Sequence, residues 1–118
     1  MLDNIVNIGV VGAGKLGTYH IQKLLNKTNC NFVGIYDSDE TIMESHKNEY
    51  NINIFNNLDS LIKKCDAIII ATPTTKHYEI SKYALNKGLH IFIEKPITDN
   101  LDDAIELKLI AQKKNKII

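Results

Sequence analysis

Hydrophobic and polar positions follow two kinds of pattern along the chain. Short apolar runs rich in Ile, Val and Phe predict β-strands at residues 5–11, 32–36, 53–55, 66–71 and 89–93. Between them, apolar residues recur three or four positions apart, which predicts helices at residues 15–25, 38–50, 57–64 and 75–86, and after Asn100. Residues 116–118 are predicted to begin a sixth strand.

The run at residues 66–71 (D-A-I-I-I-A) is apolar at successive positions and not at alternate ones. A strand of this kind is buried on both faces, which is typical of a parallel sheet covered by helices. Regular alternation of strands and helices also predicts parallel strands joined by right-handed crossovers. The fold class predicted for residues 1–118 is therefore a single α/β domain, a doubly wound parallel sheet.

Charge and composition exclude several classes of function. The 118 residues carry 14 basic and 14 acidic side chains, so the net charge is zero, which argues against nucleic-acid and acidic-membrane partners. No apolar run approaches the roughly 18 residues of a membrane helix, and the N-terminus lacks the positive start of a secretory signal. Cys30 and Cys65 have neither C-x-x-C spacing nor a His-rich context. They predict reduced thiols, no metal site and a cytoplasmic location.

A glycine-rich turn joins the first predicted strand to the first helix. Residues 12–17 (G-A-G-K-L-G) match the pattern G-x-G-x-x-G in that setting. Gly12 would allow a tight turn, Gly14 would let a pyrophosphate approach the backbone, and Gly17 would let the helix pack close to the strand. The pattern predicts a phosphate site at the positive end of the helix. A turn without a ligand is the alternative, and Lys15 either lies near the phosphates or is solvated.

An acidic residue ends the second predicted strand. Asp37 lies 20 residues after Gly17 (37 − 17), where a carboxylate can accept hydrogen bonds from the hydroxyls of an adenine ribose. It would repel a 2′-phosphate, and all basic residues are Lys, so no Arg is present to bind one. These features favour NAD over NADP. Asp37 as a cap of the next helix is a compatible interpretation, and a methyltransferase-like S-adenosylmethionine protein remains a further alternative.

Two later segments narrow the choice of family. They are T-P-T-T-K-H at residues 72–77 and E-K-P at residues 94–96, and K-G-L-H stands between them at residues 87–90. With the glycine turn and Asp37, these segments resemble the nucleotide-binding domain of the Gfo/Idh/MocA oxidoreductases, over essentially the whole chain. The resemblance implies a Rossmann fold, NAD or NADP, and hydride transfer to or from a sugar, cyclitol or nucleotide-sugar.

The resemblance also implies roles for particular residues. Lys95 is the candidate catalytic residue, because a Lys in a closing cleft can polarise or protonate the reacting oxygen. Family members often have a cis bond before the E-K-P proline, here Lys95–Pro96. His77 as a packed or capping histidine is the alternative to a ligand contact. The implied cofactor-binding residues are Gly12, Ala13, Gly14, Lys15, Leu16, Gly17, Asp37, Thr72, Pro73, Thr74, His77, Glu94 and Lys95.

The sequence departs from the family in one respect. Members normally continue into a second α/β domain that supplies the substrate site, and these 118 residues do not contain it. The expectation is therefore an NAD-binding domain that is inactive by itself and needs the second domain, which a separate chain could supply. The alternative is a non-catalytic NAD-sensing or corepressor-like module, or a pseudoenzyme.

Overall fold

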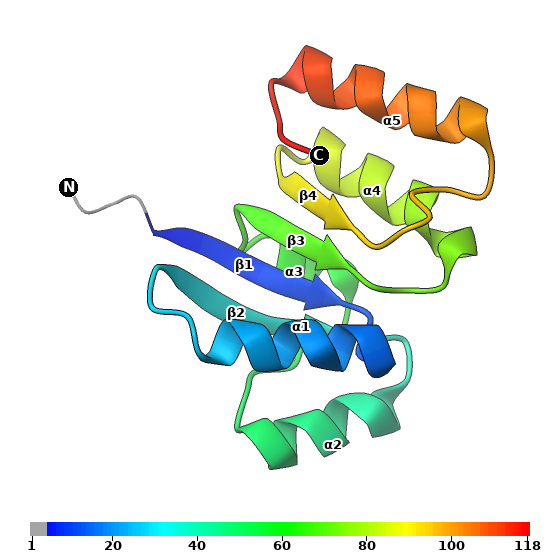
Figure 1. Cartoon of the computed structure of the whole chain (residues 1–118). Coiled ribbons are helices and arrows are strands. Elements are labelled where there is room, and N and C mark those ends of the chain that lie inside the picture. The colour runs from blue at the N-terminus through cyan, green and yellow to red at the C-terminus, as the bar shows by residue number, and fades with distance from the viewer. Residues whose placement is uncertain (1–4) are drawn as a thin grey trace.

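A single parallel sheet forms the centre of the molecule (Figure 1). The structure is a computed structural model that describes residues 5–118. The sheet has the strand order β2-β1-β3-β4, and every neighbouring pair is parallel. This arrangement confirms the predicted α/β class. The strands are β1 (Val6–Val11), β2 (Cys30–Tyr36), β3 (Ala67–Ile70) and β4 (His90–Ile93).

Helices connect the strands, and polar side chains cap three of them. Asp39, Asn57 and Asn100 each accept hydrogen bonds from backbone N–H groups of the helix that follows. These caps satisfy donors that a helix leaves free in its first turn, so they fix where α2, α3 and α5 begin. The helices are α1 (Lys15–Leu25), α2 (Glu40–Tyr50), α3 (Leu58–Ile62), α4 (His77–Asn86) and α5 (Leu101–Lys114), and a 3₁₀ turn at Thr74–Lys76 precedes α4.

Two hydrophobic cores lie on opposite faces of the sheet. Adjacent residues of β1 separate them, because Val10 belongs to the core under α1 and α2 whereas Val11 belongs to the core under α3, α4 and α5. On β3, Ile68 and Ile70 are fully buried in the second core and Ile69 packs against the first. Figure 1 shows α5 alongside α4, away from α1 and α2. The prediction that this strand is covered on both faces is confirmed.

The prediction of a strand at residues 53–55 is wrong, because this segment forms a single isolated bridge. Only Ile54 is assigned to a bridge, opposite Ile35 of β2. The Ile35 N–H donates to the Asn53 carbonyl oxygen, and the Phe55 N–H donates to the Ile35 carbonyl oxygen. Residues 51–57 read N-I-N-I-F-N-N, and asparagines, which are depleted in strands, interrupt the apolar residues on both sides of Ile54 and Phe55.

Residues 116–118 make one sheet-like contact with the free edge of β4. The Ile91 N–H donates to the Ile117 carbonyl oxygen at 3.0 Å, but this segment forms no strand in the described part of the chain. Within residues 5–118, no helix is long and apolar enough to cross a membrane.

Candidate functional site

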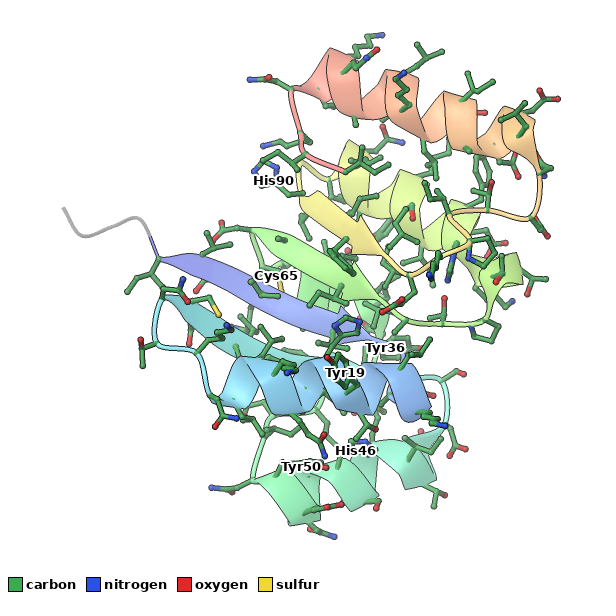
Figure 2. The ribbon with its side chains drawn as sticks, viewed as in Figure 1. Tyr19, Tyr36, His46, Tyr50, Cys65 and His90 are labelled. Atoms are coloured by element: carbon green, nitrogen blue, oxygen red, sulfur yellow. The ribbon has the colours of Figure 1, made fainter. Side chains whose placement is uncertain are left out.

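Four turns meet at one edge of the sheet. They follow β1, β2, β3 and β4, and because the strands are parallel their carboxyl ends lie together. Figure 2 shows Tyr36, the last residue of β2, toward this edge, whereas Cys65 and His90 lie toward the opposite one. Backbone bonds that extend the sheet fix the start of three turns, from Gly12 N–H to Tyr36 O (2.9 Å), Ala71 N–H to Val11 O (2.8 Å) and Glu94 N–H to Ile70 O (3.1 Å). The fold thus places all the predicted site segments on one edge.

Two glycines of the first turn are required by the protein itself. Gly12 has φ +96°, and a Cβ there would lie 2.6 Å from the Ala71 carbonyl oxygen. A Cβ at Gly17 would lie 1.8 Å from the Gly12 carbonyl oxygen. Both contacts are far below van der Waals distance, so a tight strand-to-helix connection explains these two residues without any ligand.

The middle glycine is not required by the protein. Gly14 has φ −74°, which any residue adopts, and a Cβ there would have no heavy atom within 4 Å. Neither strain nor packing therefore explains a glycine at this position. Open space next to the backbone at Gly14 is what a pyrophosphate needs for close approach.

The amino end of α1 is open as well. Gly14 is its N-cap and makes no side-chain cap bond, whereas α2, α3 and α5 are each capped by an Asp or Asn side chain. Free N–H groups and the helix dipole favour an anion at such an end. Lys15 and Leu16, the first two residues of α1, are exposed beside it. The turn and the helix start therefore fit a dinucleotide pyrophosphate.

Asp37 ties the glycine turn to the end of β2. Its Oδ2 accepts from the Ala13 N–H at 2.7 Å, and its Oδ1 accepts from the Asp39 N–H at 2.8 Å. The predicted capping function is met instead by Asp39, which accepts from the Thr41 and Ile42 N–H groups of α2. Each carboxylate oxygen has a second lone-pair direction, so the fixed carboxylate can still accept from ribose hydroxyls.

His77 joins the turns that follow β3 and β4. Its ring is buried, with Nε2 2.9 Å from the Thr72 carbonyl oxygen. Its Nδ1 lies 3.0 Å from the Pro96 carbonyl oxygen and 3.1 Å from that of Ile97. The side chain is thus held between backbone groups of the T-P-T and E-K-P segments, which gives it a positioning role in this geometry. A direct cofactor contact by His77 stays a prediction.

Replacing His77 by an apolar residue of similar volume should destabilise the protein, because the hydrogen bonds are lost while no cavity is formed. We expect His77→Leu, of similar volume, to lower the free energy of unfolding by about 2 kcal/mol, because the part-buried hydrogen bonds to the Thr72, Pro96 and Ile97 carbonyl oxygens are lost. His77→Gln, which can still donate, should lose less. Urea unfolding followed by circular dichroism measures both. Equal stability of wild type and His77→Leu would contradict this role.

Glu94 and Lys95 form the start of the fourth turn. Lys95 is exposed, and its bond to Pro96 is cis, as the resemblance implied. The Glu94 carboxylate is partly buried and pairs through Oε2 with Nε2 of His20 on α1. The first and fourth turns are therefore connected through side chains as well as through the sheet.

Two histidines that make side-chain contacts between elements were not predicted as site residues. His20 pairs with Glu94 across 74 residues, and no single-sequence pattern signals that contact. His46 on α2 has Nδ1 2.8 Å from the Ile42 carbonyl oxygen and Nε2 2.7 Å from the Thr18 hydroxyl of α1. Figure 2 shows His46 on α2 beneath α1. This second contact braces the helix that carries the glycine turn.

The remaining predicted residues divide by exposure. Ala13 and Gly17 are buried parts of the turn's frame, whereas Gly14, Lys15, Leu16 and Pro73 are exposed. Thr72 and Thr74 are half-buried at the end of β3. The two cysteines are free thiols, and Cys65 lies toward the other end of the sheet, where burial raises its pKa to about 12. That thiol is protonated near neutral pH and takes no part in the site.

Comparison with known proteins agrees with this geometry. The sequence model of the GFO_IDH_MocA family, described as "Oxidoreductase family, NAD-binding Rossmann fold", matches residues 6–118. The chain belongs to the Gfo/Idh/MocA oxidoreductase family. Its described residues form an NAD(P)-binding Rossmann domain, as the sequence motifs predicted. The family assignment also removes the methyltransferase alternative.

Several relatives in the family have named activities. UDP-N-acetylglucosamine 3-dehydrogenase of Acidithiobacillus ferrooxidans is 31% identical over 110 residues, which cover 93% of this chain and 34% of the relative. Its solved structure has a TM-score of 0.89 over 96% of this chain and 37% of that one. Glucose-6-phosphate 3-dehydrogenase of Bacillus subtilis is 33% identical over 106 residues, covering 90% of this chain and 30% of the relative.

A cyclitol enzyme is among the Gfo/Idh/MocA relatives too. Inositol 2-dehydrogenase of Corynebacterium glutamicum is 30% identical over 119 residues, covering 98% of this chain and 35% of the relative. The chain thus spans about a third of the length of the curated relatives it matches. The matched third contains the nucleotide-binding turns described above, and the rest of each relative has no counterpart in these 118 residues.

Proposed function

We propose that this chain is the NAD-binding domain of a dehydrogenase that acts on a sugar, cyclitol or nucleotide-sugar. The observation that carries the proposal is Gly14, whose lack of a side chain serves no protein contact and leaves open space at the uncapped start of α1. The substrate class is supported by relatives named for UDP-N-acetylglucosamine, glucose-6-phosphate and inositol. When bound, the nicotinamide supplies or accepts the hydride.

The chain's own residues hold the cofactor in this proposal. The N–H groups at the start of α1 bind the pyrophosphate, and Asp37 accepts from the adenine ribose. Thr72, Pro73 and Thr74 line the nicotinamide side, and Glu94 and Lys95 face the nicotinamide ribose and the substrate. Lys95, exposed after β4, holds or donates the proton at the reacting oxygen.

We further propose NAD as the cofactor, with NADP bound more weakly. The Asp37 carboxylate is held in place by two backbone N–H groups, so it cannot easily turn away from a 2′-phosphate. No Arg exists in the chain to neutralise that phosphate. Because Asp37 is held in place, we expect its repulsion of the 2′-phosphate to decide the relative affinities for NAD and NADP.

Catalysis in this proposal needs further polypeptide that supplies the substrate site, and a separate chain could supply it. The outer edge of β4, where within residues 5–118 only residues near Ile117 make a contact, and an apolar helix face support this. The Ile117 carbonyl oxygen already accepts from Ile91 on the edge of β4. On α5, Leu101, Ile105 and Leu109 recur every four residues and are 73%, 46% and 57% exposed, which is unusual for large apolar side chains on one helix face.

The non-catalytic alternative is not favoured, because the relatives with specific names are dehydrogenases. A cytoplasmic location stays an expectation from the two free thiols.

Calorimetric titration of the 118-residue chain with NADH and with NADPH tests the proposal. We expect one NADH per chain and an affinity for NADPH at least about tenfold lower, as one uncompensated charge repulsion would give. Equal affinities, or a preference for NADPH, would contradict the choice of NAD. Binding of neither cofactor by folded protein would contradict the proposed function as a whole. The same protein should turn over no sugar or cyclitol at a useful rate by itself.

A further inference from the structure

The His20–Glu94 pair lies where the two halves of the site meet. His20 is on α1, three residues after Gly17, and Glu94 is the first residue after β4. Their side chains are 14% and 20% exposed, so the pair is largely shielded from water. A shielded hydrogen bond to a carboxylate is stronger than an exposed one, because water competes less.

Aromatic rings hold the imidazole in its orientation. Tyr19 and Phe92 each pack edge-to-face against the His20 ring, with centroids 5.7 and 5.5 Å away. The Lys23 amine lies over the Tyr19 ring, 5.2 Å from its centroid, and Figure 2 shows Tyr19 on α1. Phe92 belongs to β4, so the His20 ring is packed between a side chain of α1 and a side chain of β4. Such packing restricts the imidazole to the direction of Glu94.

The order of the strands shows which part of a dinucleotide would lie near this pair. Asp37 follows β2 at one side of the sheet and the glycine turn follows β1, its neighbour. Glu94 follows β4, which is separated from β1 by β3. With strands about 4.8 Å apart, a dinucleotide anchored at β2 and β1 extends over β3 toward β4, so its nicotinamide half lies at Glu94.

We propose that His20 is a positioning residue for the nicotinamide half of the cofactor. A carboxylate only accepts hydrogen bonds, so His20 donates its Nε2–H to Glu94 and fixes the carboxylate at the edge of the sheet. The carboxylate then faces the nicotinamide ribose in a prepared orientation, which lowers the ordering cost of binding. The inference rests on the proposed function, because it assumes that NAD is the ligand.

Two amide variants test it as a matched pair. The His20→Gln amide reaches about as far as Nε2 and can still donate to Glu94, whereas the amide of His20→Asn is one carbon shorter and cannot. Both ligands used are defined: NADH, and ADP, which carries the adenosine and pyrophosphate but no nicotinamide half. Calorimetry gives the four affinities, and urea unfolding checks that each variant is folded.

We expect His20→Asn to bind NADH roughly tenfold more weakly than wild type and ADP within about twofold, as loss of one charge-assisted hydrogen bond on one side of the site would give. His20→Gln should bind NADH within about threefold of wild type. If His20→Asn does not fold, Phe92→Leu removes the ring that orients the imidazole and leaves Glu94 intact, and we expect a smaller loss of NADH affinity with ADP again within about twofold.

Different results would contradict the role of His20 and the proposed function. Unchanged NADH binding by His20→Asn, or an equal loss of NADH and ADP binding, would overturn the positioning role, the second because a purely structural contact affects both ligands. Wild-type protein that binds neither ligand would instead overturn the proposed function.

Discussion

Gly14→Ala should remain folded and lose NADH, whereas Gly17→Ala should lose the fold. A methyl group at Gly14 meets no protein atom within 4 Å, so we expect the free energy of unfolding to fall by about 1 kcal/mol or less. The same methyl occupies the space through which a pyrophosphate approaches the backbone, so NADH affinity should fall at least about tenfold. A methyl at Gly17 would lie 1.8 Å from the Gly12 carbonyl oxygen, and we expect a loss of about 3 kcal/mol or more.

Each variant is the control for the other. Urea unfolding gives the stability of both, and calorimetry with NADH gives the affinity of the folded one. If Gly14→Ala bound NADH as tightly as wild type, the open space at Gly14 would have no role in binding. If Gly17→Ala were as stable as wild type, the claim that close packing of α1 against the turn requires a glycine at this position would be wrong.

Asp37→Asn should weaken NADH binding and remove the discrimination against NADPH. The amide oxygen can still accept from the Ala13 N–H, so the turn keeps its main contact with β2, but the negative charge is lost. We expect NADH affinity to fall roughly tenfold and the NADH-to-NADPH ratio to approach one, because charge-assisted bonds to the ribose weaken and repulsion of the 2′-phosphate ends. Competitive calorimetry with both cofactors measures the ratio.

Asp37→Ala distinguishes the structural role of Asp37 from its role in cofactor binding. It leaves the N–H groups of Ala13 and Asp39 without their acceptor, so we expect an additional loss of stability of about 1–3 kcal/mol. An unchanged cofactor ratio in Asp37→Asn would contradict the assignment of Asp37 as the discriminating group, whatever the stability of the alanine variant.

Much of this architecture could be predicted from local patterns. The glycine spacing, the acid after β2 and the successive apolar residues of β3 each reflect short-range requirements of a turn, a strand end or a buried strand. The helices predicted to begin near residue 57 and after Asn100 are confirmed, with Asn57 and Asn100 as the caps of α3 and α5. These features depend on neighbours within a few residues, so one sequence is enough to reveal them.

The contacts that shape the nicotinamide side could not be predicted in this way. His20 and Glu94 are 74 residues apart, and His77 meets Pro96 and Ile97 only because β3 and β4 are neighbours in the sheet. Their partners are set by tertiary packing, which leaves no periodic trace in the sequence. The stretch at residues 53–55 was misassigned for a related reason: its apolar residues are real, but only one residue is assigned to a bridge with β2.

The central claim is that NAD binds across the carboxyl ends of the strands with its pyrophosphate at the start of α1. Amide nitrogen–proton NMR spectra recorded during titration with NADH test it directly, since a 13.3 kDa protein gives resolved signals. The account predicts shifts at Gly12, Gly14, Lys15 and Thr74, with Gly88 at the opposite edge unchanged. Shifts confined to the opposite edge, or no shifts at saturating NADH, would contradict it.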